Sequence, residues 1–388
     1  MPAQALMSLE QQIVHAGFQV EQHTIQTEDG YLLQAFRIPS RLGKARNKQP
    51  AILQHGVVDQ GGTWFFNVPE KCLAYQLVDE GYDVWITNSR GTSLSNDHLR
   101  FSSDSREFWD FSFHEMAKYD VPANLNYILE ETGAQQAVYV GHSQGTSQWF
   151  LANALYPEIN QKFKAFIGIA PVIYADNVHT ALVDTLIKAE VPEKLMKKGM
   201  AFMHTTEKVV TYLRKMARHF PRTALVFVQS ICGVNERQHV DPSRIPIMAG
   251  NDIGGTSAKT LYHWKQLVET GMIREFDYGV EKNLKLYNQT TPPPYAIDTL
   301  KDRLSQVHIM LFIGDKDIFT TKPTVDKLMA LMPNATSSVT HHSGIEYRKD
   351  MVQLVSIEDY NHGDYMWAMD SDELVNTPIK AFLRKAME

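Results

Sequence analysis

The sequence predicts an α/β domain with a mostly parallel sheet, interrupted by a long helical insertion. Short apolar runs typical of buried strands alternate with helical stretches from residue 51 to residue 171, and again after residue 300. This alternation is typical of a parallel sheet with helices on both faces. Between about residues 176 and 290 helical, methionine-bearing segments replace it. We therefore expect a core domain in two parts, residues 1–175 and 291–388, with residues 176–290 inserted between them.

The first predicted element is a hairpin. In HTIQTEDGYLLQAFRIP, residues 23–39, Asp29-Gly30 separates two alternating runs, which is a strong hairpin signal. The elements that follow alternate between strand and helix, and Gly81 and Gly133 end the first two helices. They are a strand at 51–55, a helix at 71–81, a strand at 82–88, a helix at 113–133, a strand at 136–141, a helix at 144–155 and a strand at 163–171. After the insertion come a strand at 307–317, a helix at 324–332 and a strand at 351–359.

The composition is that of an ordinary globular protein, with 44% hydrophobic and 21% charged residues. A net charge of −6 argues against nucleic acid as a main partner, because binding phosphates needs a positive face. The sequence has no run of eighteen apolar residues, so no segment is predicted to span a membrane.

The N-terminus and the cysteines bear on the compartment. MPAQALMSLEQQ has neither a basic nor an apolar leader region, so we expect either an intracellular protein or a mature chain from which a signal was removed. Cys72 and Cys232 allow at most one disulfide, and we expect two buried thiols.

The pentapeptide Gly141-His142-Ser143-Gln144-Gly145 fits the pattern G-x-S-x-G. When a serine projects from a tight strand-to-helix turn, the turn leaves little room for a Cβ atom two residues before and two residues after it. Glycine has no Cβ and so fits both positions. An apolar strand precedes this pentapeptide and a helix follows it, as the motif requires. Ser143 is therefore the candidate nucleophile, and a structural turn is the weaker interpretation.

A serine nucleophile needs a histidine base and an acid that orients it. In this kind of fold the acid and then the histidine follow the serine along the chain, each after a later strand. Asp315 and Asp317 both follow the strand at 307–317, and we favour Asp317 because it lies deeper in the loop. Asp315 is expected to accept local backbone N–H groups.

His362 follows the last predicted strand and is the candidate base. His341 and His342 precede that strand, and we interpret them as exposed loop residues.

The oxyanion that forms during acyl transfer needs two N–H donors. One is expected from the backbone of Gln144, directly after the nucleophile, and the other from the loop after an early strand. His55-Gly56 follows the strand at 51–55, so we assign the second donor to the Val57 N–H. Because HExxH, CxxC, GxGxxG and P-loop motifs are absent, we expect neither a metal nor a cofactor.

Several long motifs now suggest a family. They are TEDGYLLQAFRIP, LQHGVV, GYDVWITNSRG, FWDFSFHEMAKYDVPANLNYI, YVGHSQGTS, GGTSAKTLYHWKQ, YNQTTPPPY and YNHGDYMWAMD. With them the chain resembles, over nearly its whole length, the acid lipases of the α/β-hydrolase superfamily, the group of gastric lipase and lysosomal acid lipase. The resemblance implies hydrolysis of triacylglycerols and sterol esters, at a lipid–water interface, by a Ser-Asp-His triad under a helical cap.

Carried over residue by residue, the resemblance places the nucleophile, acid and base on Ser143, Asp317 and His362. The oxyanion amides fall on Val57 and Gln144, and the cap falls on the insertion.

The chain departs from the family at one point. Members carry a second cysteine shortly before the one in ICG, with which it pairs, whereas residues 222–231 here contain none and Cys232 has no local partner. The resemblance favours a secreted or lysosome-like location over a cytoplasmic one. Two alternative functions remain open: a soluble carboxylesterase acting on shorter esters, and a non-catalytic lipid carrier.

Overall fold

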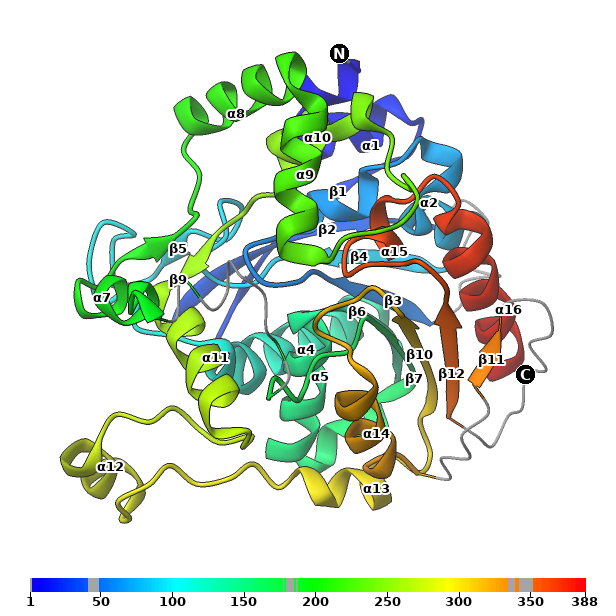
Figure 1. Cartoon of the computed structure of the whole chain (residues 1–388). Helices are drawn as coiled ribbons and strands as arrows, with labels where there is room; N and C mark the ends of the chain where they lie inside the picture. Colours follow the sequence, from blue (N-terminus) through cyan, green and yellow to red (C-terminus); the bar gives the residue numbers. More distant parts are fainter. Residues whose placement is uncertain are drawn as a thin grey trace.

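The computed structural model describes residues 2–40, 49–176, 178, 185, 188–333, 339–341 and 352–388. Within these residues the centre of the molecule is a ten-stranded sheet with the order β1-β2-β4-β3-β6-β7-β10-β12-β11, and β5 pairs with β2 at one end (Figure 1). From β4 to β11 every neighbouring pair is parallel, whereas β1, β2 and β5 pair antiparallel. The predicted α/β fold with a mostly parallel sheet is confirmed.

Apart from β5 and β11, which were not predicted, the strands of the sheet lie where the sequence predicted them, within a few residues. The hairpin is confirmed as β1 (Glu21–Gln26) and β2 (Tyr31–Ile38), and Gly30 between them has φ 100°. The other strands of the sheet are β3 (Pro50–Gln54), β4 (Asp83–Thr87), β5 (Asp97–His98), β6 (Ala137–His142), β7 (Phe163–Ile169), β10 (His308–Gly314), β11 (Val339–His341) and β12 (Gln353–Ile357).

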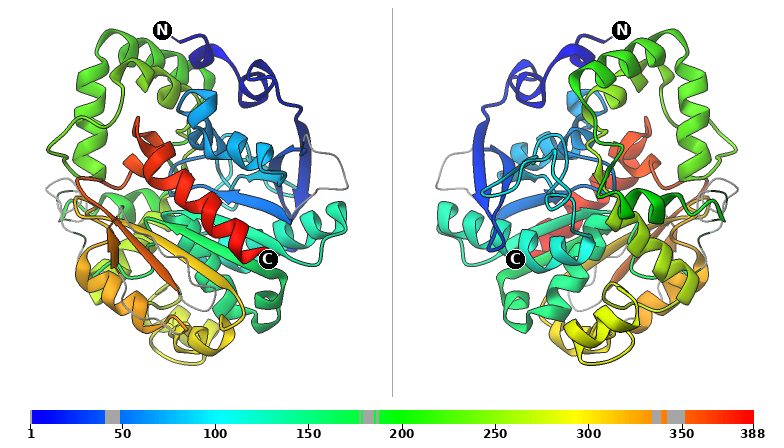
Figure 2. Two further views of the ribbon diagram at one scale, coloured as in Figure 1. Left: turned by 90° about the vertical axis from the view of Figure 1, so that its right-hand side faces the viewer. Right: turned by 90° about the vertical axis from the view of Figure 1, so that its left-hand side faces the viewer.

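Helices cover both faces of the sheet because successive side chains of each buried strand point to opposite faces. In β6, Val138 and Val140 pack in the cluster that includes α1, α2 and α16, whereas Tyr139 packs in the cluster with α4, α5, α13 and α14. Figure 2 shows α16 crossing the first of these faces. The helices are α1 (Leu9–His15), α2 (Leu73–Asp79), α4 (Val121–Thr132), α5 (Gln144–Leu155), α13 (Leu300–Arg303), α14 (Lys322–Ala330), α15 (Asp364–Trp367) and α16 (Thr377–Ala386).

Residues 176–290, which we call the inserted segment, are mostly helical where they are described. Its elements are α7 (Val191–Lys197), β8 (Ala201–Phe202), α8 (Glu207–His219), α9 (Pro221–Cys232), α10 (Ile245–Asn251), β9 (Thr256–Ser257), α11 (Ala258–Thr270) and α12 (Val280–Tyr287). Helices α8, α9 and α10 share a small apolar cluster with Phe66 of the core, and Figure 1 shows α12 on an arm that projects from the molecule. The boundaries of the three predicted regions stay predictions.

Two expectations need correction. The predicted helix at 113–133 is divided into α3 (Phe113–Glu115), a π-helical turn at Met116–Asp120 and α4, because Pro122 has no N–H to continue the regular ladder. His341 was expected in a loop but is the last residue of β11. This short strand forms by pairing with β12, and such a tertiary contact leaves no signal in the local sequence. His342 lies outside the described residues.

The cysteine prediction is confirmed, since Cys72 and Cys232 are both free and buried. In the described part of the chain, no helix combines the length and apolar character needed to cross a membrane.

Candidate active site

Ser143 occupies a strained turn between β6 and α5. Its φ of 52° and ψ of −122° are unusual for a residue with a side chain. The flanking glycines are required sterically: a Cβ at Gly141 would lie 2.9 Å from the carbonyl carbon of Gly145, and a Cβ at Gly145 would lie 2.6 Å from the carbonyl oxygen of Gln54. The turn therefore exists only with glycine at both positions, as the motif predicted.

The structure brings Ser143, His362 and Asp317 together from three loops. His362 Nε2 lies 2.7 Å from Ser143 Oγ, and His362 Nδ1 lies 3.0 Å from both carboxylate oxygens of Asp317. All three residues are buried, with 4–7% of their surface exposed. The hydrogen-bonded chain has the geometry that proton transfer from the hydroxyl to the imidazole requires.

Asp317 is held in its charged form. Burial alone would raise the pKa of this carboxyl, but the adjacent His362 and hydrogen bonds, including one from the Phe319 N–H at 2.8 Å, bring it below its ordinary value. The competing Asp315 instead accepts the backbone N–H of Asp359 at 2.5 Å. The prediction of local backbone partners for Asp315 is wrong in this respect, because the amide belongs to the loop after β12.

His142 does not contact the hydroxyl of Ser143 as a base would. Its Nε2 lies 3.0 Å from the backbone carbonyl oxygen of His362, and burial, with a contribution from His362, lowers its pKa to about 3. The neutral ring therefore acts as a donor to the loop that carries His362.

Of the two residues predicted to bind the oxyanion, one adjoins Ser143 in the chain and the other lies in a loop that packs against Ser143. Gln144 is the first residue of α5, so its N–H has no carbonyl partner within the helix. Val57 follows Gly56, where a Cβ would lie 3.1 Å from the Cβ of Ser143. His55 fixes this loop because its Nδ1 lies 2.8 Å from the Gly56 carbonyl oxygen. The roles of the two amides stay predictions.

Comparison with known proteins identifies the family. Residues 9–68 match the model "Partial alpha/beta-hydrolase lipase region", and residues 50–228 match the model "alpha/beta hydrolase fold". The chain is 34% identical over 379 residues to a Crotalus adamanteus protein that carries the name of a lysosomal acid lipase/cholesteryl ester hydrolase, covering 95% of this chain and 88% of that one. It is 33% identical over 395 residues to gastric triacylglycerol lipase of Bos taurus, covering 98% and 92%.

The chain belongs to the family of the gastric and lysosomal acid lipases.

Solved structures agree with this family at the level of the fold. A thermostable carboxyl esterase of Bacillus coagulans is 13% identical with a TM-score of 0.55, and covers 95% of this chain and 99% of its own. A soluble variant of monoglyceride lipase of Saccharomyces cerevisiae is 15% identical with a TM-score of 0.53, and covers 95% and 98%.

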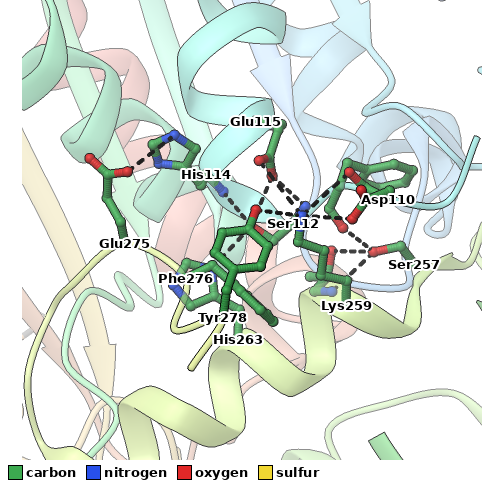
Figure 3. A network of polar contacts seen from close by, with 12 residues as sticks. Asp110, Ser112, His114, Glu115, Ser257, Lys259, His263, Glu275, Phe276 and Tyr278 are labelled. Atoms are coloured by element: carbon green, nitrogen blue, oxygen red, sulfur yellow. Dashed lines mark hydrogen bonds and ion pairs between the residues drawn. The ribbon is translucent and has the colours of Figure 1, made fainter. Parts of the chain in front are cut away.

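In this member of the acid lipase family, side chains of α11 in the inserted segment make hydrogen bonds and an ion pair with the core (Figure 3). The ammonium of Lys259 lies 2.9 Å from a carboxylate oxygen of Asp110 and 2.9 Å from the hydroxyl of Tyr278. One turn further along, His263 Nδ1 lies 3.0 Å from the hydroxyl of Ser112. The same helix reaches the nucleophile turn, because the indole N–H of Trp264 donates to Gln144 Oε1 at 2.8 Å.

Sequence reasoning missed Trp264 and Tyr365 as parts of the site. The hydroxyl of Tyr365 donates to Asp317 Oδ2 at 3.3 Å and so gives the acid a further hydrogen bond. Both residues lie in the motifs GGTSAKTLYHWKQ and YNHGDYMWAMD, so the signal was present but carried no assigned role.

A cavity of about 850 Å³ on the inserted segment does not reach the nucleophile. It lies against α7 and α11, and its lining includes Lys259, Tyr262 and Tyr278 but neither Ser143 nor His362. Ser143 and His362 are only 6% and 7% exposed. In the described part of the chain, no three His, Cys, Asp or Glu side chains are grouped as ligands for a metal ion.

Proposed function

We propose that the chain hydrolyses carboxylic esters of long-chain fatty acids through an acyl-enzyme on Ser143. The observation that carries the proposal is the continuous hydrogen-bonded chain from the Ser143 hydroxyl through His362 to the Asp317 carboxylate. A structural turn would not need these three side chains from three separate loops.

The reaction begins when Ser143 Oγ attacks the ester carbonyl while His362 Nε2 takes its proton. Asp317 holds the imidazole in the required tautomer and stabilises the imidazolium that forms. His362 then gives the proton to the leaving alcohol, and the acyl group remains on Ser143. In the second half, water attacks this acyl-enzyme with His362 as the base, and the fatty acid is released.

The amides of Val57 and Gln144 are the proposed donors to the tetrahedral oxyanion. Each such donor contributes about 3 kcal/mol to transition-state stabilisation in comparable hydrolases. Because both donors belong to the backbone, their positions matter more than their side chains.

The substrate class proposed is triacylglycerols and sterol esters at a lipid–water interface. The names of the relatives support it, since one is a gastric triacylglycerol lipase and another carries the name of a cholesteryl ester hydrolase. The inserted segment is the proposed cap over the site, and we expect it to move so that a lipid ester can reach Ser143, which is 6% exposed. The inserted segment exposes large apolar side chains that suit a lipid surface. They include Val209, Tyr212, Phe220, Val226 and Phe227.

A secreted or lysosome-like location is proposed on the same grounds, with a cytoplasmic location as the alternative. Subcellular fractionation of the native host, with an antibody to the chain, tests it. We expect the chain in the lysosomal or extracellular fraction, whereas a purely cytosolic signal would contradict this location.

The function is tested by hydrolysis of emulsified triolein and cholesteryl oleate, with p-nitrophenyl butyrate as the short soluble ester. We expect the wild type to hydrolyse at least one emulsion in preference to the short ester, and Ser143→Ala to lose activity by about 10⁴-fold or more. Preference for the short ester would favour the soluble carboxylesterase. A wild type without activity on any of the three would favour the lipid carrier.

A further inference from the structure

The C-terminal end of α9 contacts the loop that carries Asp317 and the loop that carries His362. Cys232 is the last residue of α9, and its carbonyl oxygen accepts the backbone N–H of His362 at 3.0 Å. At the next residue, Gly233, φ is 114°, and a Cβ would lie 2.2 Å from the carbonyl oxygen of Lys316, the residue before Asp317. Only glycine allows so close an approach to the acid loop.

Asn235 connects the same segment to the base loop with its side chain. Its amide nitrogen donates to the carbonyl oxygen of Asp359 and, at 2.6 Å, to the carboxylate of Asp364. Its amide oxygen accepts from the side chain of Asn361 at 2.5 Å. The three partners lie on both sides of His362 in the chain, so one side chain from the inserted segment spans the turn that presents the base.

Asp359 makes hydrogen bonds with the residues of the inserted segment that follow Asn235. Its carboxylate accepts the N–H of Glu236 at 2.7 Å and the N–H of Arg237 at 2.9 Å, and it lies 3.1 Å from His239 Nε2. Although burial opposes ionisation, these donors lower the pKa of Asp359, which is 4% exposed. The contacts therefore involve a charged carboxylate, which makes them stronger than neutral hydrogen bonds.

The backbone at Asp359 is itself strained. Its φ is 61°, in the left-handed region that residues with side chains avoid. Such strain persists only where the surrounding contacts enforce it, and it is concentrated at functional sites. Val58 in the Val57 loop and Ser143 itself share this property, with φ of 55° and 52°.

We propose that residues 232–239 and Asp359 form a joint that sets the position of His362 relative to Asp317 and Ser143, with Asp359 as a positioning residue. The joint acts through the backbone of the base loop. It holds in place the Cys232 carbonyl oxygen that accepts the His362 N–H, and it holds the conformation of the turn before His362. None of its residues is among the proposed nucleophile, acid, base and oxyanion donors. The inference rests on the proposed catalytic roles of Ser143, Asp317 and His362.

Two variants in the full-length chain test the joint from its two sides. Asp359→Asn keeps the shape but replaces one acceptor oxygen by a donor that faces the N–H groups of the segment. Asn235→Ala removes the hydrogen bonds that the inserted segment makes to the base loop and leaves the Asp359 side chain unchanged. It therefore tests the proposal even if Asp359→Asn does not fold. Asp326→Asn is the matched control, because Asp326 is an exposed carboxylate on α14 whose ion pair is with Lys322, one turn away in the same helix.

The readout is kcat on p-nitrophenyl butyrate per active site, with sites counted by titration with a fluorophosphonate. We expect kcat to fall about 10- to 100-fold in both joint variants, because displacing a base by about 1 Å has effects of this size, while KM stays within threefold. The control should match the wild type in both constants.

A purely structural role would give a different result. If fewer active sites react with the fluorophosphonate but each keeps the wild-type kcat, the contacts only stabilise the fold. That result would overturn the inference. Ser143→Ala measured in parallel keeps the two proposals apart. Activity that survives Ser143→Ala refutes the proposed catalytic site itself, whereas an inactive Ser143→Ala with fully active joint variants refutes the joint alone.

Discussion

A methyl group at Gly145 would strike the loop that carries the proposed oxyanion donor. In Gly145→Ala the new Cβ would lie 2.6 Å from the carbonyl oxygen of Gln54 and 2.8 Å from that of His55. These atoms belong to the backbone at the end of β3, so no side-chain rotation relieves the contact. Either α5 moves away from β3, or the loop that contains Val57 is displaced from Ser143.

The size of the effect follows from that distance. Ordinary van der Waals contact begins near 3.4 Å, so the two backbones must separate by about 0.8 Å. Overpacking of this kind costs about 1–3 kcal/mol of folding stability. A displacement approaching 1 Å between nucleophile and oxyanion donors should lower kcat by about 10- to 100-fold.

The assay compares Gly145→Ala with Gly133→Ala, in kcat per titrated site and in thermal unfolding. Gly133 ends α4 with φ 69°, and its Cβ would meet nothing within 4 Å. This control should lose about 1 kcal/mol of stability through backbone strain and keep its kcat. Wild-type kcat in Gly145→Ala would refute the steric account of the turn.

Three further changes test other contacts. Tyr365→Phe removes the hydroxyl that donates to Asp317 and should lower kcat by about 2- to 10-fold without changing KM, as steady-state kinetics will show; an unchanged kcat would remove Tyr365 from the site. Burial raises the pKa of Asp252 from 3.8 to about 7, so its contribution to stability is complete below pH 4 and is lost as the pH rises through 7. Asp252→Asn should therefore melt at a higher temperature than the wild type at pH 8 but not at pH 4, and an equal difference at both pH values would contradict the raised pKa. Lys259→Met removes the buried cation that lies 2.9 Å from Asp110 and 4.0 Å from the partly buried carboxylate of Glu115, and should cost about 1–3 kcal/mol in chemical denaturation; a loss below about 0.5 kcal/mol would show that Lys259 is dispensable.

The sequence predicted the parts of the site that depend on order along the chain. An apolar strand, a glycine-flanked serine and a helix are local signals, so Ser143 and its turn could be identified from nine residues. Asp317 and His362 follow the ends of later parallel strands, and those ends meet at one edge of the sheet. The choice of Asp317 over Asp315 rested on depth in the loop, and only Asp317 contacts His362.

The contacts between the inserted segment and the core could not be predicted. Trp264 and Gln144 are 120 residues apart, and Asn235 and Asp359 are 124 apart, so no periodicity or local motif connects them. Short elements such as β11 were missed for a related reason. Three residues carry too little pattern, and their strand conformation comes from pairing with β12.

The proposed function depends most on Ser143 as the nucleophile and on its activation by His362. Its most direct test is reaction of the full-length chain with a fluorophosphonate, followed by mass spectrometry of the peptides. We expect one phosphonyl group per chain, on Ser143, at a rate that falls by at least about 10³-fold in His362→Gln. Label on another residue, or equally fast labelling of Ser143 in His362→Gln, would contradict it.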